Sequence, residues 1–589
     1  MPDTFSIFLI RLPIMNVQKK CVYYVLCTLF SFFCFFFPSY AEALNFKDDT
    51  EAETLAGNIA DALSDEDALA QILMFGWRDI SGEPSKLIRE WISRRHIGSV
   101  KVFGWNTADT EQLARNIGIF QRLAGLNPYN IPLLVATDQE GGLVRHVKGR
   151  TIETPGAMAI GASGFPQDAY LSGYYIGREL AILGINMNFA PTVDLYTNHR
   201  SVLIGSRSFG DNPANAGIMG IAFAKGLKAS GVIPTAKHFP GHGDTDLDSH
   251  GTLPTIDADF DTLWDRELVP YRMFSAEGLP AVMSGHLAFP NTASKMIPAS
   301  LSQFFLTDIL RTKIGFKGVV VTDDIMMNGA TYATGSLWRT AKEALIAGND
   351  ILMMNSTPEL DDSIWTNLVS AMRTEPDFKR RVREAAKRVL ALKLKYLRGT
   401  NAPPLIPDIQ KVREGIPDKE GGDFFYSLAA RSATTIKNGT KNGTAVLPLN
   451  TKTRETIFLL GQSLDFFAAG KKILAKERSV SVDSINNAGV SSYWYSAPIT
   501  DDLMRRAAAS DIIIFYLSNN EGIEVLRSLR NLNKKIIVLS VLSPAYIGQV
   551  SWVDAAIAVY SDSPESIAAG FSTILGTINA GGTLPFVLE

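Results

Sequence analysis

The sequence predicts an α/β fold in which a (β/α)8 TIM barrel precedes a smaller α/β sandwich domain. Three observations lead to this prediction. Eight short apolar runs alternate with helical patterns, polar residues follow most of these runs directly, and a proline-rich segment then separates a second group of strand patterns. The 589 residues, 46% of them hydrophobic, are enough for a large barrel and a second domain, and this composition excludes intrinsic disorder.

The eight apolar runs are the predicted barrel strands. Most are rich in Val, Ile, Leu, Met and Phe, which is typical of strands buried on both faces. They lie at residues 71–77, 99–105, 132–137, 185–190, 232–237, 281–284, 318–322 and 350–354.

Helical patterns lie between these runs, including residues 110–123 and 301–314. Ser300 is the expected N-cap of the second helix, which should end before Gly315. A basic amphipathic helix over residues 377–397 completes the predicted barrel domain, residues 42–398.

Polar residues follow the predicted strands at their carboxyl ends, where barrel enzymes have their catalytic residues. Because the carboxyl ends of barrel strands form one rim, this pattern favours a closed barrel over the alternative, a doubly wound open sheet. The residues are Asp138, Asp194, Lys237, His238, His286, Asp323 and Asn355.

Residues 399–422 are predicted to be a linker because four prolines interrupt them. The sandwich domain, residues 423–589, has strand patterns at 456–460, 511–516, 535–540 and 555–559, and a helical pattern at 501–509. The sequence Lys-Asn-Gly-Thr occurs at 437–440 and again at 441–444. Both copies match the glycosylation sequon, but Asn-Gly favours a turn.

Residues 1–41 are predicted to be a signal peptide. Two lysines precede an apolar run, and small residues follow at Ser39 and Ala41. We therefore expect an exported protein, periplasmic or secreted. A retained N-terminal membrane anchor is the alternative, and Met15 is an alternative start.

All three cysteines, Cys21, Cys27 and Cys34, lie in this segment. A mature chain from Glu42 would therefore have no disulfide, thiolate metal site or cysteine nucleophile. The net charge is −3, from 57 basic and 60 acidic residues. This balance argues against a nucleic-acid partner.

The segment 237–250 gathers three histidines and several aspartates among glycine and proline. Since Pro240 and Gly241 exclude a helix, we expect a mobile polar loop on the rim. His238, His242, Asp248 and His250 form a possible metal-ligand set, but without a helix the two histidines at i and i+4 need not face one way. A metal site is therefore the weaker interpretation.

Asp323 ends a hydrophobic strand and faces this loop in the predicted barrel. Retaining glycoside hydrolysis needs a nucleophilic carboxylate and a proton donor on the leaving-group side. Asp323 fits the first role. His250, made more basic by Asp248, fits the second because imidazole titrates near neutrality.

Five segments then carry a specific resemblance. They are Asp-Gln-Glu-Gly-Gly at 138–142, Asn-Phe-Ala-Pro-Thr-Val-Asp at 188–194, Gly-Ser-Arg-Ser-Phe at 205–209, Lys-His-Phe-Pro-Gly-His-Gly-Asp at 237–244 with Asp-Ser-His at 248–250, and Thr-Asp-Asp at 322–324. The chain resembles glycoside hydrolase family 3, in its β-N-acetylglucosaminidase branch. The second domain, up to Gly-Thr-Leu-Pro at 582–585, resembles the family's C-terminal sandwich.

The resemblance implies a retaining, exo-acting β-N-acetylglucosaminidase that releases terminal β-linked GlcNAc from peptidoglycan fragments or chitooligosaccharides. It implies Asp323 as nucleophile and Asp248 with His250 as the acid/base dyad. No cofactor is implied, and the oligomeric state stays open. The residues implied to hold the sugar are Asp138, Arg207, Lys237 and His238.

One position departs from the family pattern. The branch usually has an arginine eight residues after the first aspartate, and here that residue is His146, preceded by Arg145. Both remain candidates for this sugar contact.

Other functions stay open at this point. A β-glucosidase or β-xylosidase of the same family would need another acid, for which Glu521 is the best candidate. A glycosyl phosphorylase is a further enzyme option, and a non-catalytic wall-binding protein is the alternative of another class.

Overall fold

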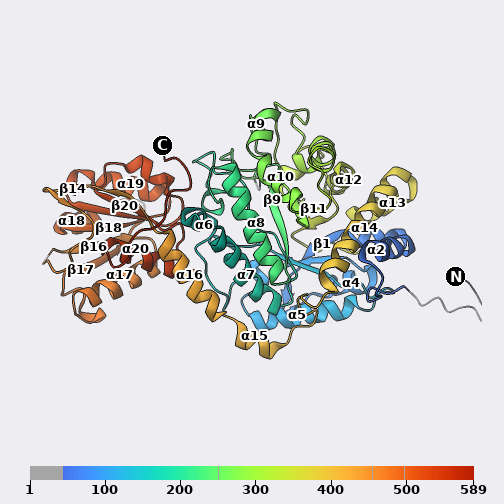
Figure 1. The fold of residues 1–589 in the computed structure, drawn as a ribbon, viewed down its shortest axis with the longest axis horizontal. Coiled ribbons are helices and arrows are strands. Elements are labelled where there is room, and N and C mark those ends of the chain that lie inside the picture. The colour runs from blue at the N-terminus through green and yellow to red at the C-terminus, as the bar shows by residue number, and fades with distance from the viewer. Residues whose placement is uncertain (1–43, 250, 454, 497, 589) are drawn as a thin grey trace, which may run out of the picture. The chain divides into compact units, whose positions relative to one another are not determined.

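The computed structural model describes residues 44–249, 251–453, 455–496 and 498–588. The predicted signal segment, residues 1–41, therefore lies outside the described residues. From Phe46 onward the chain forms one compact unit that contains two large sheets (Figure 1). Over the described residues, no helix combines the length and apolar character needed to cross a membrane.

Eight parallel strands form the first sheet, as predicted. Their order is β11-β10-β9-β8-β5-β4-β1-β12, and a parallel bridge from Val321 to Ile351 links the two end strands. The sheet is therefore a nearly closed barrel rather than an open, doubly wound sheet. The strands are β1 (Leu73–Gly76), β4 (Ser99–Lys101), β5 (Leu134–Thr137), β8 (Met187–Asn188), β9 (Ile233–Phe239), β10 (Ala281–Ser284), β11 (Val319–Thr322) and β12 (Leu352–Met354).

Helices surround these strands (Figure 1). In α5, the Asp109 carboxylate caps the first turn by accepting the N–H groups of Glu111 and Gln112. The barrel helices are α2 (Ala52–Ala62), α3 (Asp65–Gln71), α4 (Lys86–Arg95), α5 (Thr110–Ala124), α6 (Ala157–Ser163), α7 (Pro166–Ile182), α8 (Pro213–Ala229), α9 (Phe260–Asp265), α10 (Leu268–Ala276), α11 (Asn328–Thr331), α12 (Leu337–Ala347), α13 (Ser363–Thr374) and α14 (Pro376–Leu397).

The helix predicted over 301–314 differs in the structure. A 3-10 turn, η3 (Ala299–Leu301), comes first, and a π-helix, η4 (Phe304–Lys313), follows it. Ser300 is buried and accepts or donates a hydrogen bond at the Nδ1 of His286. It is therefore not the N-cap that the sequence predicts, since tertiary contact with His286 engages its hydroxyl.

The segment predicted as a linker contains regular structure. It includes α15 (Ile409–Gly415) and the start of α16 (Lys419–Ser432). The Asp408 and Asp418 side chains cap these two helices, so α15 begins between Pro407 and Pro417 and α16 begins after Pro417.

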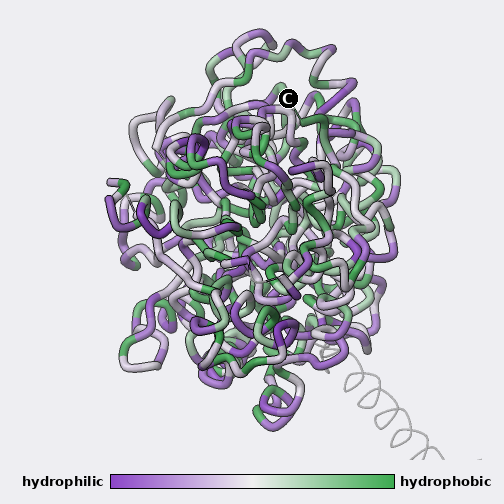
Figure 2. Tube along the Cα trace, turned by 90° about the vertical axis from the view of Figure 1, so that its left-hand side faces the viewer, coloured by the Kyte–Doolittle hydropathy of each residue, from purple (hydrophilic) through white to green (hydrophobic). Residues whose placement is uncertain are grey.

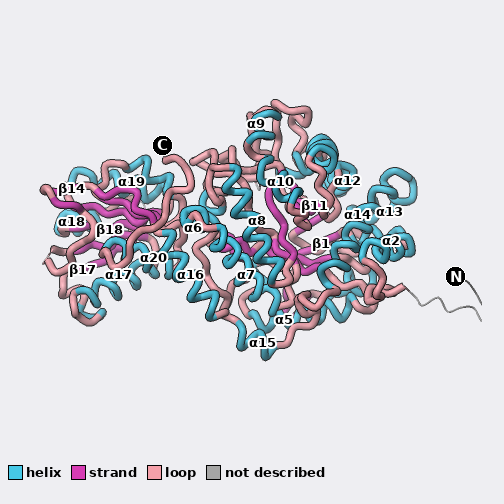
Figure 3. Tube along the Cα trace, viewed as in Figure 1, coloured by secondary structure: helices cyan, strands magenta, loops and turns pink. Residues whose placement is uncertain are grey.

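The second sheet has six strands in the order β13-β20-β19-β18-β16-β17, and Figure 3 shows its strands as a group separate from those of the barrel. Only β13 is antiparallel to its neighbour. Helices cover the sheet (Figure 1), and hydrophobic and hydrophilic stretches are interspersed along the chain (Figure 2). The strands β16, β18 and β20 are buried at every residue. The elements are β13 (Thr434–Asn438), β16 (Ile457–Gly461), α17 (Leu464–Glu477), β17 (Val490–Trp494), α18 (Asp501–Ala509), β18 (Ile512–Leu517), α19 (Asn520–Leu529), β19 (Lys535–Ser540), β20 (Ala555–Ala558) and α20 (Pro564–Ile574).

The second Asn-Gly pair forms a turn, as the sequence favours. Asn442 and Gly443 have φ of 54° and 79° between the short strands β14 (Thr440–Lys441) and β15 (Thr444–Ala445). Positive φ at both residues is the requirement of a two-residue type I′ hairpin.

Residues 583–587 pack against the barrel domain. The N–H of Thr583 donates to the carbonyl of Ala162, and the N–H of Asp211 donates to the carbonyl of Pro585. Phe586 packs with Met158 and Tyr196 in an apolar cluster shared with the second sheet.

Candidate active site

Four of the predicted site residues lie at the carboxyl ends of barrel strands. Asp138 follows β5, Asp323 follows β11, and Lys237 and His238 lie near the end of β9. Since the strands run parallel, their ends meet on one rim of the barrel.

Two lysines bind the carboxylate of Asp138. The Nζ of Lys237 lies 2.5 Å from Oδ1, and the Nζ of Lys101 lies 2.6 Å from Oδ2. Burial alone would raise the pKa of Asp138, but the charges of Lys101 and Lys237 hold it well below its ordinary value. Asp138 is therefore an anion that can accept hydrogen bonds from a ligand's hydroxyl groups.

Glu140 joins the same cluster. Its two oxygens accept hydrogen bonds from the Nε and Nη2 of Arg207, each at 2.8 Å. Its Oε1 also lies 2.6 Å from the Nζ of Lys237. Burial opposes ionisation, but Arg207 and Lys237 lower the pKa of Glu140 to about 2. Glu140 thus fixes both cations, and Arg207 sits in the short η2 (Gly205–Arg207).

Asp323 differs from these two carboxylates. Its Oδ1 accepts the N–H of Asp324 at 2.8 Å, and within the described residues no lysine or arginine pairs with it. Burial would raise its pKa, but the nearby His238 and His286 lower it. Asp323 is therefore an ionised, half-buried carboxylate.

The neighbouring Asp324 has the opposite environment. Burial raises the pKa of its carboxyl group, and the Nδ2 of Asn355 donates to its Oδ2 at 2.5 Å. Environments that push the pKa values of adjacent acids apart assign them different roles. Asp324 has a structural position, and Asp323 remains available for chemistry.

Asp194 holds the segment that follows β9. It accepts the backbone N–H of His242 at 2.7 Å, and the Nδ1 of His238 lies 2.7 Å from its Oδ2. Burial alone would raise the pKa of Asp194, but the charge of His238 lowers this pKa to about 2. Nδ1 of His238 therefore donates to the carboxylate, which leaves its Nε2 for another partner.

The sequence was wrong about part of the 237–250 loop. The fifth strand, predicted to end at Lys237, continues through His238 to Phe239 as β9, and the chain stays buried through Gly243. The Asp194 carboxylate satisfies backbone N–H groups that would otherwise need water, which is why so polar a segment is buried.

His242 is also buried, and its burial lowers its pKa to about 4. Throughout the described part of the chain, no group of three or more His, Cys, Asp or Glu side chains is arranged to hold a metal ion.

Of the predicted dyad, only Asp248 lies within the described residues. Asp248 is exposed, and His250 lies outside the described residues. The carbonyl of Ser249 accepts the N–H of Gly329 at 3.1 Å, and Gly329 belongs to α11, shortly after Asp323 in the chain. The loop that carries Asp248 is thus attached to the segment that follows Asp323.

Arg145 and His146 have different surroundings. Arg145 pairs with Glu153 at 2.5 Å and donates to the carbonyl of Thr151. The Nδ1 of His146 lies 3.5 Å from Asp138 and 3.2 Å from the Nζ of Lys101. Of the two candidates, only His146 contacts the Asp138 cluster.

Residues 65–392 match the family model described as the glycosyl hydrolase family 3 N-terminal domain. The chain belongs to glycoside hydrolase family 3. It is accordingly a glycoside hydrolase, and the cluster of charged groups on the barrel rim is its candidate active site.

Three related proteins illustrate the family. Beta-hexosaminidase A of Pseudoalteromonas piscicida is 30% identical over 79% of this chain and 80% of its own length. A beta-hexosaminidase of Neisseria gonorrhoeae (strain NCCP11945) is 36% identical over 46% of this chain and 74% of its own. The solved structure of a glycoside hydrolase family 3 beta-N-acetylglucosaminidase from Paenibacillus sp. str. FPU-7 has a TM-score of 0.78 and 26% identity, covering 90% of this chain and 99% of that one.

In this glycoside hydrolase, two site residues escaped the sequence-based prediction. Glu140 lies inside the Asp-Gln-Glu-Gly-Gly motif, so its place near Asp138 was a usable signal. Lys101 lies in an apolar strand pattern, where nothing local marks it.

Glu521, the alternative acid, lies in α19 of the second domain, where it accepts a hydrogen bond from Gln462 at 2.9 Å.

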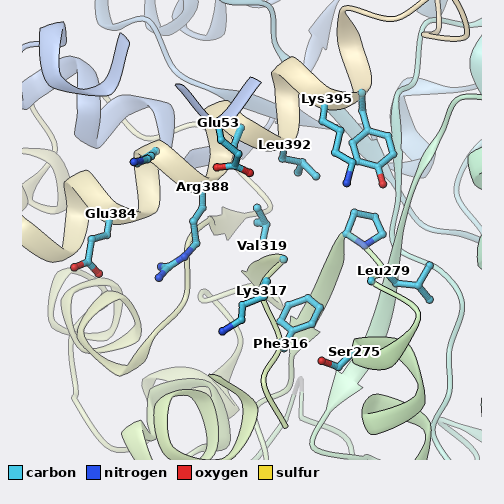
Figure 4. Close-up of a pocket in the computed structure, with 16 residues that line it drawn as sticks. Glu53, Ser275, Leu279, Phe316, Lys317, Val319, Glu384, Arg388, Leu392 and Lys395 are labelled. Atoms are coloured by element: carbon cyan, nitrogen blue, oxygen red, sulfur yellow. The ribbon is translucent and has the colours of Figure 1, made fainter. Parts of the chain in front are cut away.

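A pocket of about 570 Å³ lies at the other end of the barrel (Figure 4). Its lining includes Pro280 and Gly318, which precede β10 and β11, whereas Asp323 follows β11. Lys317, Arg388 and Lys395 give it a partly basic wall. None of the candidate active-site residues lines it.

Proposed function

We propose that this glycoside hydrolase is an exo-acting β-N-acetylhexosaminidase that releases terminal β-linked N-acetylglucosamine with retention of configuration. Two relatives, of which this chain covers 80% and 77%, are named beta-hexosaminidase A and beta-hexosaminidase, and a structural neighbour is described as a beta-N-acetylglucosaminidase. These names support the substrate class.

The observation that carries the mechanism is the contrast among the carboxylates. Lysine or arginine side chains bind both oxygens of Asp138 and of Glu140. Asp323 uses only Oδ1, for a backbone N–H, and its Oδ2 has no hydrogen-bond partner in the described residues. An ionised carboxylate with an available oxygen has the properties of a nucleophile.

The proposed reaction has two steps. Asp323 attacks the anomeric carbon and forms a glycosyl ester, while His250, supported by Asp248, gives a proton to the departing oxygen. In the second step His250 removes a proton from water, the water oxygen attacks the anomeric carbon, and the ester bond to Asp323 breaks. Asp138, Lys237, Arg207 and His238 hold the sugar through its hydroxyl groups.

The test uses purified protein and paired chromogenic substrates. We expect 4-nitrophenyl N-acetyl-β-glucosaminide to be hydrolysed with a higher kcat/KM than 4-nitrophenyl β-glucoside. Asp323→Asn should abolish turnover and keep the fold, and a 2-fluoro sugar inhibitor should label Asp323. Preference for the glucoside, or labelling of Asp324 or Glu521, would overturn the assignment, and a rate that depends on phosphate would indicate a phosphorylase.

We also propose export and a cell-wall or chitin-derived substrate. The basic and apolar pattern of residues 1–41 supports export, which would place the enzyme where peptidoglycan fragments or chitooligosaccharides occur. N-terminal sequencing and thiol titration of the exported protein test this. We expect a start near Glu42 and no thiol, and detection of a cysteine would show that the segment is retained.

A further inference from the structure

Lys101 is a buried cation whose hydrogen-bonding capacity is fully used. Its side chain is 0% exposed, and its Nζ lies 2.6 Å from Asp138 Oδ2, 3.1 Å from the carbonyl oxygen of Val102 and 3.2 Å from His146 Nδ1. An ammonium group has three N–H donors and no acceptor. The three neighbours therefore account for all three donors.

This geometry determines the tautomer of His146. Because Lys101 can only donate, Nδ1 of His146 must accept, and an imidazole nitrogen that accepts carries no proton. The proton of the neutral ring is then on Nε2. Burial and the charge of Lys101 lower the pKa of His146 to about 4, so the ring is neutral near pH 7.

His146 lies beside Asp138 and is partly exposed. Its backbone N–H donates to the carbonyl of Asp138 at 2.9 Å, and its ring packs against Phe103 with 5.5 Å between centroids. Its side chain is 29% exposed, compared with 15% for Asp138. Nε2 makes no hydrogen bond to any part of the protein that the structure describes.

The Nδ1 of His146 lies 3.5 Å from Asp138 Oδ2, so the ring that carries the Nε2–H donor lies beside the carboxylate. The Asp138 carboxylate accepts, and Nε2–H of His146 donates, so together they match a hydroxyl group, which does both. By contrast, Arg145 has its guanidinium engaged by Glu153 and by backbone carbonyls.

We propose that His146 binds one hydroxyl group of the terminal sugar through Nε2–H, and that Lys101 is a positioning residue that holds His146 in the required tautomer. This inference rests on the proposed function, because it assigns a specificity contact to the sugar that Asp138 holds. It makes Lys101, which touches no substrate, a determinant of that contact.

The kinetic test compares wild type with His146→Phe, which removes the donor and keeps a ring against Phe103. The substrates are 4-nitrophenyl N-acetyl-β-glucosaminide and its 3-, 4- and 6-deoxy analogues. A neutral hydrogen bond contributes about three- to tenfold, so kcat/KM on the parent substrate should fall by that factor. For one deoxy analogue the two enzymes should be equal, while the other analogues keep the full difference.

His146→Gln is the conservative variant, since its amide offers a donor, and it should recover part of the loss. An unchanged kcat/KM in His146→Phe, or an equal loss with all the analogues, would overturn the contact. Absence of any turnover by wild type would instead refute the proposed function and would leave the tautomer to be tested separately.

The second test reads the tautomer directly. In protein labelled with ¹⁵N-histidine, the signal assigned by its loss in His146→Phe should show a protonated Nε2 and an unprotonated Nδ1 near pH 7. Lys101→Met should give a mixture of tautomers and a fall in kcat/KM that His146→Phe does not deepen. If wild type shows protonated Nδ1, the proposal is wrong, even if Lys101→Met does not fold.

Discussion

Replacement of Glu140 by glutamine should lower the free energy of unfolding of the barrel, because Glu140 is paired with two buried cations. The substitution keeps the shape but leaves the buried Arg207 and Lys237 without the carboxylate that lies 2.8 and 2.6 Å from them. A carboxyl group whose pKa falls from 4.5 to about 2 on folding contributes about 3 kcal/mol to the free energy of unfolding. Removal of one partner of a buried ion pair costs a similar amount, about 3–5 kcal/mol.

The pH dependence has a definite sign. Because the pKa is lower in the folded state, the contribution of Glu140 is complete above pH 4.5 and is lost as the pH falls toward 2. The difference in unfolding free energy between wild type and Glu140→Gln should therefore be largest at neutral pH and less than half as large at pH 3.

Urea denaturation followed by tryptophan fluorescence measures this difference. Glu153→Gln is the matched control, since Glu153 also pairs with an arginine but its side chain is 48% exposed, so its loss should cost below about 1 kcal/mol. If Glu140→Gln loses no more stability than Glu153→Gln at pH 7, the cluster does not depend on Glu140 as argued.

The remaining predictions concern the acid/base loop. His250→Ala should slow natural disaccharides about 10²–10⁴-fold more than dinitrophenyl glycosides, which need little protonation, and equal losses in a leaving-group series would give His250 a binding role only. Asp248→Asn should act in the same direction and move the basic limb of the pH–rate profile lower, because the imidazolium loses its neighbouring charge; a limb that does not move argues against the pair. Gly329→Ala should lower kcat on chitobiose on the order of tenfold, because its Cβ would lie 3.1 Å from the carbonyl oxygens of Ser249 and Thr252. Gly422→Ala, where nothing lies within 4 Å, is the control, and equal activity of the two variants would dissociate the loop from catalysis.

Much of the barrel could be predicted because its strands are buried on both faces. Each of the eight apolar runs contains or overlaps a strand, and the runs at 281–284 and 535–540 coincide with β10 and β19. In the second sheet, the two strands that the sequence did not predict, β13 and β17, are the edge strands. Their partly exposed residues do not produce an apolar run.

Candidate site residues were predictable only where they directly follow a predicted strand or lie within a sequence motif. Asp138 and Asp323 stand directly after apolar runs, so their position on the rim follows from the barrel. The importance of Lys101 depends on Asp138 and His146, which lie on other segments of the chain. No local pattern encodes such a contact.

The packing of residues 583–587 against α6 has a consequence for synthesis. These residues are translated on the order of ten to forty seconds after α14 completes the barrel. During that interval Met158 and Tyr196 lack the ring of Phe586 that later packs against them. During synthesis the barrel domain therefore lacks the packing that Phe586 provides. A segment translated late completes an apolar cluster of the domain that is translated first.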